Sequence, residues 1–71
     1  MNKDKQVGGD HYSRFDIQPF DIIREYKLNY WEGNVIKYLL RHTIKGGKQD
    51  LLKSLHYLEF LLENYEELFH E

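Results

Sequence analysis

The feature that most constrains this sequence is a run of apolar residues in its last third, at alternating spacings of four and three. The run consists of Leu51, Leu55, Leu58, Leu62, Tyr65 and Phe69. At 100° per residue these side chains form one narrow seam along an α-helix, whereas a strand requires alternation with a period of two. The sequence therefore predicts a helix of roughly 20 residues, about 30 Å long, from near Lys48 to the C-terminus.

Two further helices are predicted before this seam. The only proline, Pro19, suits the first position of a helix, because a backbone N–H there has no intrahelical acceptor. This first helix is expected to end near Lys27. Asn29 followed by Glu32 has the spacing of a capping box and predicts the start of the second helix, which the glycines at 46–47 are expected to end. No alternating pattern typical of strands is present, so the predicted fold class is all-α.

Chain length limits how these helices can form a core. Seventy-one residues form at most one domain, which buries only about 60 % of its unfolded surface. The absence of cysteine excludes disulfides and zinc–thiolate sites. We expect residues 1–10 to be a flexible lead-in and residues 11–71 to form one helical domain. Association of copies is the remaining route to a larger core, so a homo-oligomer is predicted, with an interface made of Leu55, Leu58, Leu62, Tyr65 and Phe69.

Positive charge is concentrated in one part of a chain whose net charge is −2. Residues 37–53 carry five basic side chains and one acidic one, whereas residues 54–71 carry five acidic side chains and no Lys or Arg. General nucleic-acid binders are usually basic, so nucleic acid is an unlikely partner. No apolar run reaches the roughly 20 residues that span a bilayer, and the N-terminus lacks the apolar core of a signal peptide. We therefore expect a cytoplasmic protein that does not contact the membrane.

The basic residues of the predicted second helix fall on one face. Asn34, Lys37, Arg41 and Lys45 lie within about 80° on the helical wheel, and the glycine corner leads into a helix whose first N–H groups favour an anion. Arg and Lys are the usual phosphate ligands. The pattern indicates a site for a small anion, and the alternative is an ordinary solvated helix face. The candidate ligand residues are His11, Tyr12, Asn34, Lys37, Tyr38, Arg41, Lys45, Gly46, Gly47 and Lys48.

Three other features bear on the chemistry of this site. His11 can donate to phosphate or exchange a proton near neutral pH, and Tyr38 is the aromatic residue nearest the basic face, where it could contact a nucleobase. Glu32, Asp50 and Asp21 are carboxylates that could hold Mg²⁺. Each of these acids, however, falls in the first turn of a predicted helix, which explains it without a metal. We predict neither a metal nor a cofactor, and the sequence assigns no catalytic residue.

Four blocks of sequence carry a resemblance to a known family. They are GGDHY at 8–12, IQPFDII at 17–23, EGNVIKYLLRH at 32–42 and KGGKQDLLKSLHYL at 45–58. In order and spacing they resemble the SaV-like family of small bacteriophage and prophage proteins, a domain of unknown function. The resemblance implies an early-expressed phage accessory protein in the host bacterial cell, acting on the host or on nucleotide pools. A larger relative in short-tailed coliphages is described as a nucleotide kinase without a P-loop that forms a large oligomer.

The residues and the resemblance together predict a nucleotide-binding protein. The expected ligand is a nucleotide or cyclic nucleotide held by Lys37, Arg41, Lys45 and His11, and its capture would counter host defence. Two alternatives stay open: a nucleoside monophosphate phosphotransferase, and a module that binds a host protein through the third helix. Whether any bond is broken is not decided by the sequence.

Overall fold

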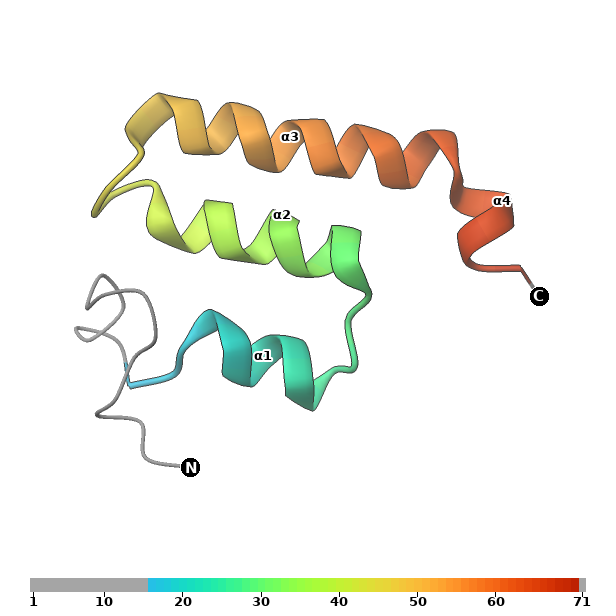
Figure 1. The fold of residues 1–71 in the computed structure, drawn as a ribbon, viewed down its shortest axis with the longest axis horizontal. Coiled ribbons are helices and arrows are strands. Elements are labelled where there is room, and N and C mark those ends of the chain that lie inside the picture. Colours follow the sequence, from blue (N-terminus) through green and yellow to red (C-terminus); the bar gives the residue numbers. More distant parts are fainter. Residues whose placement is uncertain (1–15, 71) are drawn as a thin grey trace.

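The computed structural model describes residues 16–70, and this part of the chain is helical throughout (Figure 1). The elements are α1 (Pro19–Glu25), α2 (Tyr30–Arg41), α3 (Gly47–Glu63) and α4 (Tyr65–Leu68). Helices α2 and α3 run antiparallel side by side, and α1 lies on the other side of α2 (Figure 1). The predicted all-α class is confirmed, and residues 16–70 contain no strand. The predicted lead-in at 1–10 lies outside the described residues.

The starts of α1 and α2 follow from capping by side chains. The Asn29 Oδ1 atom accepts a hydrogen bond of 2.8 Å from the Glu32 N–H, and the Glu32 carboxylate accepts one of 2.9 Å from the Asn29 N–H. At α1 the Gln18 N–H donates to the Asp21 carboxylate at 2.8 Å. Each bond satisfies a donor that a helix end leaves without a backbone acceptor. The capping box predicted for the second helix is confirmed.

The predicted long C-terminal helix is broken in the structure. Helix α3 ends at Glu63, and the four-residue helix α4 follows after Asn64. The Asn64 side-chain amide donates to the Phe60 carbonyl at 3.0 Å, as does its backbone N–H. An asparagine that bonds to the backbone in this way favours a helix end over a helix interior. The periodic seam identified the helix correctly, but it carried no signal for this break.

Helix α2 is held between its two neighbours by close contacts. Gly33 is buried, and a Cβ atom there would lie 3.3 Å from the side chain of Ile23 in α1. On the other side, Trp31 stacks on Phe60 with ring centroids 4.9 Å apart, and the Ser54 hydroxyl donates to the Val35 carbonyl at 2.9 Å. Gly33 therefore lets α2 approach α1 closely, and the hydrogen bond from Ser54 of α3 holds the α2 backbone close to α3.

The four helices leave little room for an enclosed core. The described part of the molecule extends over 38 × 29 × 17 Å, so the helices form a single flat layer (Figure 1). Among residues 16–70, Leu61 is the one large hydrophobic side chain that is buried, with 8 % of its surface still exposed. Burial of such a side chain contributes about 1.5–3 kcal/mol. The layer therefore depends on specific contacts between helices as well as on apolar burial.

The corner between α2 and α3 requires glycine at both of its glycine positions, for different reasons. Gly47 has φ +57°, in the left-handed region that side chains with a Cβ rarely adopt, and its N–H donates to the His42 carbonyl at 2.8 Å. A Cβ atom added to Gly46 would overlap the carboxylate of Asp50. The first glycine makes room for a side chain, and the second allows the turn.

Replacement of Gly46 by Ala should destabilise the protein by about 1–3 kcal/mol, because the new methyl group must displace a buried carboxylate. Urea denaturation followed by circular dichroism measures this loss. Gly47→Asn is the comparison at the other glycine of the corner: open space surrounds this position, so any loss there comes from the positive φ of 57° alone and should be smaller than that of Gly46→Ala, since Asn tolerates a positive φ better than most residues do. Equal stability of Gly46→Ala and the wild type would show that the carboxylate is not held where the structure has it.

Candidate functional site

The strongest polar contact in the described residues joins the last turn of α2 to the first turn of α3. The Arg41 Nε atom donates to Asp50 Oδ2 at 2.9 Å, and Arg41 Nη2 donates to Asp50 Oδ1 at 3.0 Å. This is a bidentate pair, the strongest geometry available to arginine and a carboxylate. Asp50 is 1 % exposed, so the contact is screened from water on the carboxylate side.

The surroundings of Asp50 keep it ionised. The hydrogen bond from Arg41 holds the pKa of the Asp50 carboxyl below its ordinary value of 3.8, and this effect outweighs burial, which acts in the opposite direction. The positive charges of Arg41 and Lys53 and a backbone hydrogen bond from Gly46 lower the pKa further. The carboxylate is therefore a fixed negative charge at the corner.

This carboxylate changes the interpretation of the glycine corner. The sequence analysis placed an external anion beside residues 46–47, at the start of the third helix. In the structure the side chain of Asp50 supplies an anion at this position, bound to Arg41 and to the backbone of Gly46. Two donors of Arg41 are used in the same contact. In the structure Gly46, Gly47 and Arg41 thus form the connection between α2 and α3.

A second cluster of charge lies around the ring of Tyr38, and we call Lys37, Tyr38 and Lys53 the Tyr38 cluster. The Lys37 ammonium lies 4.6 Å from the centroid of the Tyr38 ring, and the Lys53 ammonium lies 5.3 Å from it. The Arg41 guanidinium is 4.8 Å from the same centroid. Cations at these distances interact with the negative face of the ring. Three basic side chains from two helices thus meet at one aromatic ring.

The ring of Tyr38 is positioned by α3. It stacks on Tyr57 with centroids 6.0 Å apart and an interplanar angle of 10°. Tyr57 in turn meets Tyr30 edge to face at 6.0 Å. A hydrogen bond with Tyr30 raises the pKa of the Tyr57 hydroxyl. Burial and electrostatic interaction with the hydroxyls of Tyr30 and Tyr38 raise this pKa further. Tyr57 therefore stays neutral near pH 7 and gives Tyr38 an uncharged stacking partner.

The remaining predicted ligand residues lie in several different places. Asn34 is buried, and its side-chain amide donates to the Tyr30 carbonyl at 2.8 Å, so it contacts its own helix. Lys45 and Lys48 are exposed on either side of the glycine corner. His11 and Tyr12 lie outside the described residues. Of the ten predicted positions, the structure brings Lys37, Tyr38 and Arg41 together around one ring.

Lys53 is the residue that the sequence analysis left out of the site. It stands 15 residues after Tyr38 in the sequence, on a different helix, so the helical wheel of α2 gives no sign of it. Only the antiparallel register of α2 and α3 brings it to the ring. The one available signal was its place in the basic segment 37–53, which does not say which basic residues converge.

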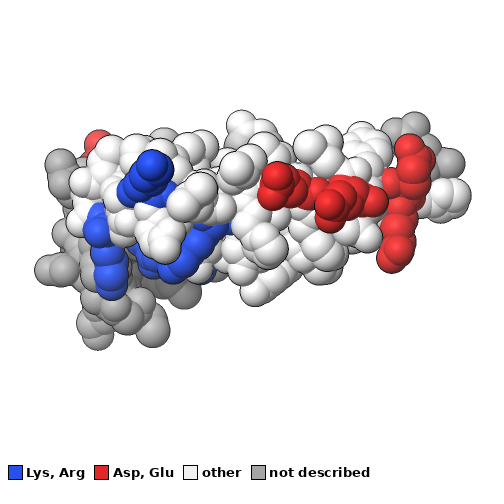
Figure 2. Space-filling view, turned by 90° about the horizontal axis from the view of Figure 1, so that it is seen from above, with Lys and Arg blue, Asp and Glu red and all other residues white. Residues whose placement is uncertain are grey.

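Charge is separated along the face of α3 that Figure 2 shows. Lys and Arg gather over the end that holds the α2–α3 corner, and Asp and Glu gather over the opposite end (Figure 2). Within residues 16–70 no group of His, Asp and Glu is arranged to hold a metal ion. None of the four described helices combines the length and the apolar content needed to cross a bilayer. The basic end carries the positive potential of this face.

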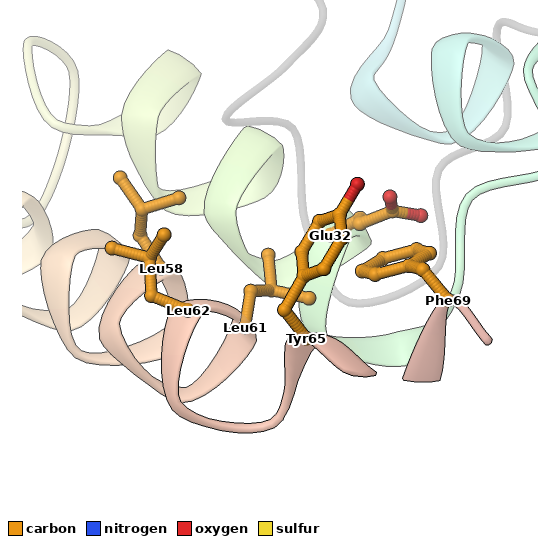
Figure 3. Close-up of a pocket in the computed structure, with 6 residues that line it drawn as sticks. All are labelled: Glu32, Leu58, Leu61, Leu62, Tyr65 and Phe69. Carbon is orange, nitrogen blue, oxygen red and sulfur yellow. The ribbon is translucent and has the colours of Figure 1, made fainter. Parts of the chain in front are cut away.

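An apolar pocket of about 420 Å³ lies at the opposite, acidic end, where α3 meets α4 (Figure 3). Its one charged lining residue is Glu32, whose carboxylate also caps α2. A pocket with leucine walls and a carboxylate does not favour a phosphate group. The lining residues are Glu32, Leu58, Leu61, Leu62, Tyr65 and Phe69.

Comparison with known families places most of the chain in one of them. A family model described as a protein of unknown function, DUF3310, matches residues 7–59. This span contains the Tyr38 cluster, the Arg41–Asp50 pair and all ten predicted ligand positions. Comparison with curated proteins and with solved structures finds no match. The family match covers more than half of the chain, and its description names no ligand.

Replacement of Asp50 by Asn should lower the stability of the protein at pH 7, because it removes the charge that Arg41 binds. The difference from the wild type should shrink as the pH falls. Stability that comes from a lowered pKa is present above the unfolded-state pKa and is lost as the pH falls through the folded-state pKa. Urea denaturation at pH 7 and at successively lower pH values measures the difference, with Glu63→Gln as a control for loss of an exposed carboxylate. A difference that is constant across this range would contradict the proposed state of Asp50.

Proposed function

The chain belongs to the DUF3310 family, and from that premise we propose that it binds a nucleotide or a nucleotide-derived phosphate through the Tyr38 cluster. The bound nucleotide is held without being converted, so that the protein acts as a stoichiometric sink. The resemblance to small phage proteins supports a role in host takeover, in which capture of a signalling nucleotide counters a host defence. Lys45 and Lys48, exposed near the corner, add positive charge to the same end of the molecule.

One observation carries this proposal: Lys37 and Lys53 approach a single aromatic ring from two different helices. Their ammonium groups are 4.6 and 5.3 Å from the Tyr38 centroid, so the distance between them cannot exceed the sum of these two values. Like charges within about 10 Å of each other repel weakly in water, and a bound anion would relieve that repulsion. The whole chain has a net charge of −2, so this positive cluster is a local feature.

The chemistry of the Tyr38 cluster fits a nucleotide better than a simple inorganic anion. A nucleotide offers phosphate groups to the two ammonium groups and a flat base that can lie against aromatic side chains. Tyr38 and Tyr57 bring two aromatic rings to this place, with their centroids 6.0 Å apart. The cluster needs no P-loop, because lysine binds phosphate as a point charge.

Calorimetric titration with a panel of nucleoside monophosphates, diphosphates and cyclic nucleotides tests the proposal. At least one should bind, and Lys37→Ala and Lys53→Ala should each weaken that binding by about tenfold, because each removes one charge-assisted contact. Lys27→Asn is the matched control: it removes one positive charge from the loop between α1 and α2, where Lys27 has φ 53°. This control should bind as the wild type does.

Two results would count against the proposal. Absence of binding across the whole panel would reject nucleotide capture. Binding that Lys37→Ala and Lys53→Ala leave unchanged would place the ligand elsewhere.

The phosphotransferase alternative has a separate measurement, since ADP would form from ATP in the presence of a nucleoside monophosphate. No contact among the described residues favours phosphate transfer over simple binding.

A further inference from the structure

One face of α3 is left uncovered by the other described helices. Leu61 packs toward α2 and is 8 % exposed, whereas its neighbour Leu62 is 71 % exposed. The same uncovered face continues along the helix. We call this set the α3 seam: Leu51, Leu55, Leu58 and Leu62, each at least 39 % exposed. Monomeric proteins rarely leave a continuous apolar stripe of this length in water.

We propose that the α3 seam binds the α3 seam of a second copy of this chain, with the two helices antiparallel. This proposal does not depend on nucleotide binding. The flat shape of the molecule supports it, because a layer 17 Å thick can enclose a core only when a second layer covers it. The seam has the four-and-three spacing that packs one helix against another.

The pocket at the junction of α3 and α4 supports the same partner. Leu58 and Leu62 belong both to the seam and to the lining of this pocket (Figure 3). A depression of about 420 Å³ within an apolar stripe can accept a side chain from a facing helix, in the manner of a knob entering a hole. The leucines of a second copy have the size and polarity that this pocket accommodates.

Charge selects the antiparallel orientation. Lys48 and Lys53 lie in the first half of α3, and the acidic side chains lie from Glu59 onward. Parallel helices would place the basic ends together and the acidic ends together, whereas antiparallel helices place each basic end against an acidic end (Figure 2). Exposed charges of this kind add little affinity, but they select orientation and partner.

The seam also defines the register of the two helices. Its midpoint lies between Leu55 and Leu58, so a twofold axis there places Leu51 of one copy opposite Leu62 of the other. Leu55 then lies opposite Leu58. In a parallel pair each of these residues would instead meet its own counterpart. The two orientations therefore predict different neighbours for Leu51.

Disulfide cross-linking separates these orientations, because the natural chain contains no cysteine. Leu51→Cys and Leu62→Cys variants are mixed in equal amounts and oxidised gently, and the dimers are identified by the masses of their cross-linked peptides. The antiparallel arrangement predicts that the mixed Leu51→Cys/Leu62→Cys dimer clearly exceeds the half of all dimers that random pairing would give. Leu39→Cys is the control, since Leu39 is 45 % exposed on α2, away from the seam, and should cross-link only at the background rate.

Predominance of the symmetric Leu51→Cys dimer would overturn the antiparallel orientation. Cross-linking no faster than in the Leu39→Cys control would overturn self-association through the seam.

Sedimentation of the cysteine-free chain provides the second measurement, and a dimer is expected. The double variant Glu63→Lys with Glu67→Lys should weaken this dimer several-fold at low salt, with a smaller effect at high salt. These acidic residues are exposed, so folding should survive the change. A wild-type chain that stays monomeric at high concentration would overturn the proposal.

Discussion

The ion pair between Arg41 and Asp50 is the contact on which the arrangement of α2 and α3 depends. It closes the corner between the two longest helices with two hydrogen bonds of 2.9 and 3.0 Å. Gly46 is small because the carboxylate occupies the space beside it. The antiparallel register that follows brings Lys53 to Tyr38. A buried pair of this kind adds little net stability relative to apolar packing, but loss of either partner leaves an unpaired buried group.

The molecule divides its surface between two kinds of recognition. One end of the α2–α3 hairpin is basic and presents an aromatic ring that two lysines approach, and the other end is acidic and carries an apolar pocket. We propose that the basic end binds a small anion and that the apolar stripe between the ends binds a second copy.

Much of the fold was predictable because its signals are local. Asn29 and Glu32 form the expected capping box, and the seam marks the last long helix. The break at Asn64 was missed, because the apolar spacing continues through Tyr65 and Phe69 as if the helix were unbroken. The candidate site was predicted in part. Lys37 and Tyr38 were found on one helical wheel, whereas Lys53 was not, because it reaches the ring from another helix.

The sequence by itself determined the helical class, the helix starts, the uneven charge and the apolar seam, because each depends on residues within a few turns of one another. The tertiary structure decided what the charges do. Arg41 and Asp50 are nine positions apart, and no helical wheel contains both. Once α2 and α3 fold together, Arg41 binds Asp50, and Lys37 and Lys53 meet at the Tyr38 ring. The structure likewise decided which face of α3 is covered, since Leu61 is buried whereas Leu55, Leu58 and Leu62 stay exposed.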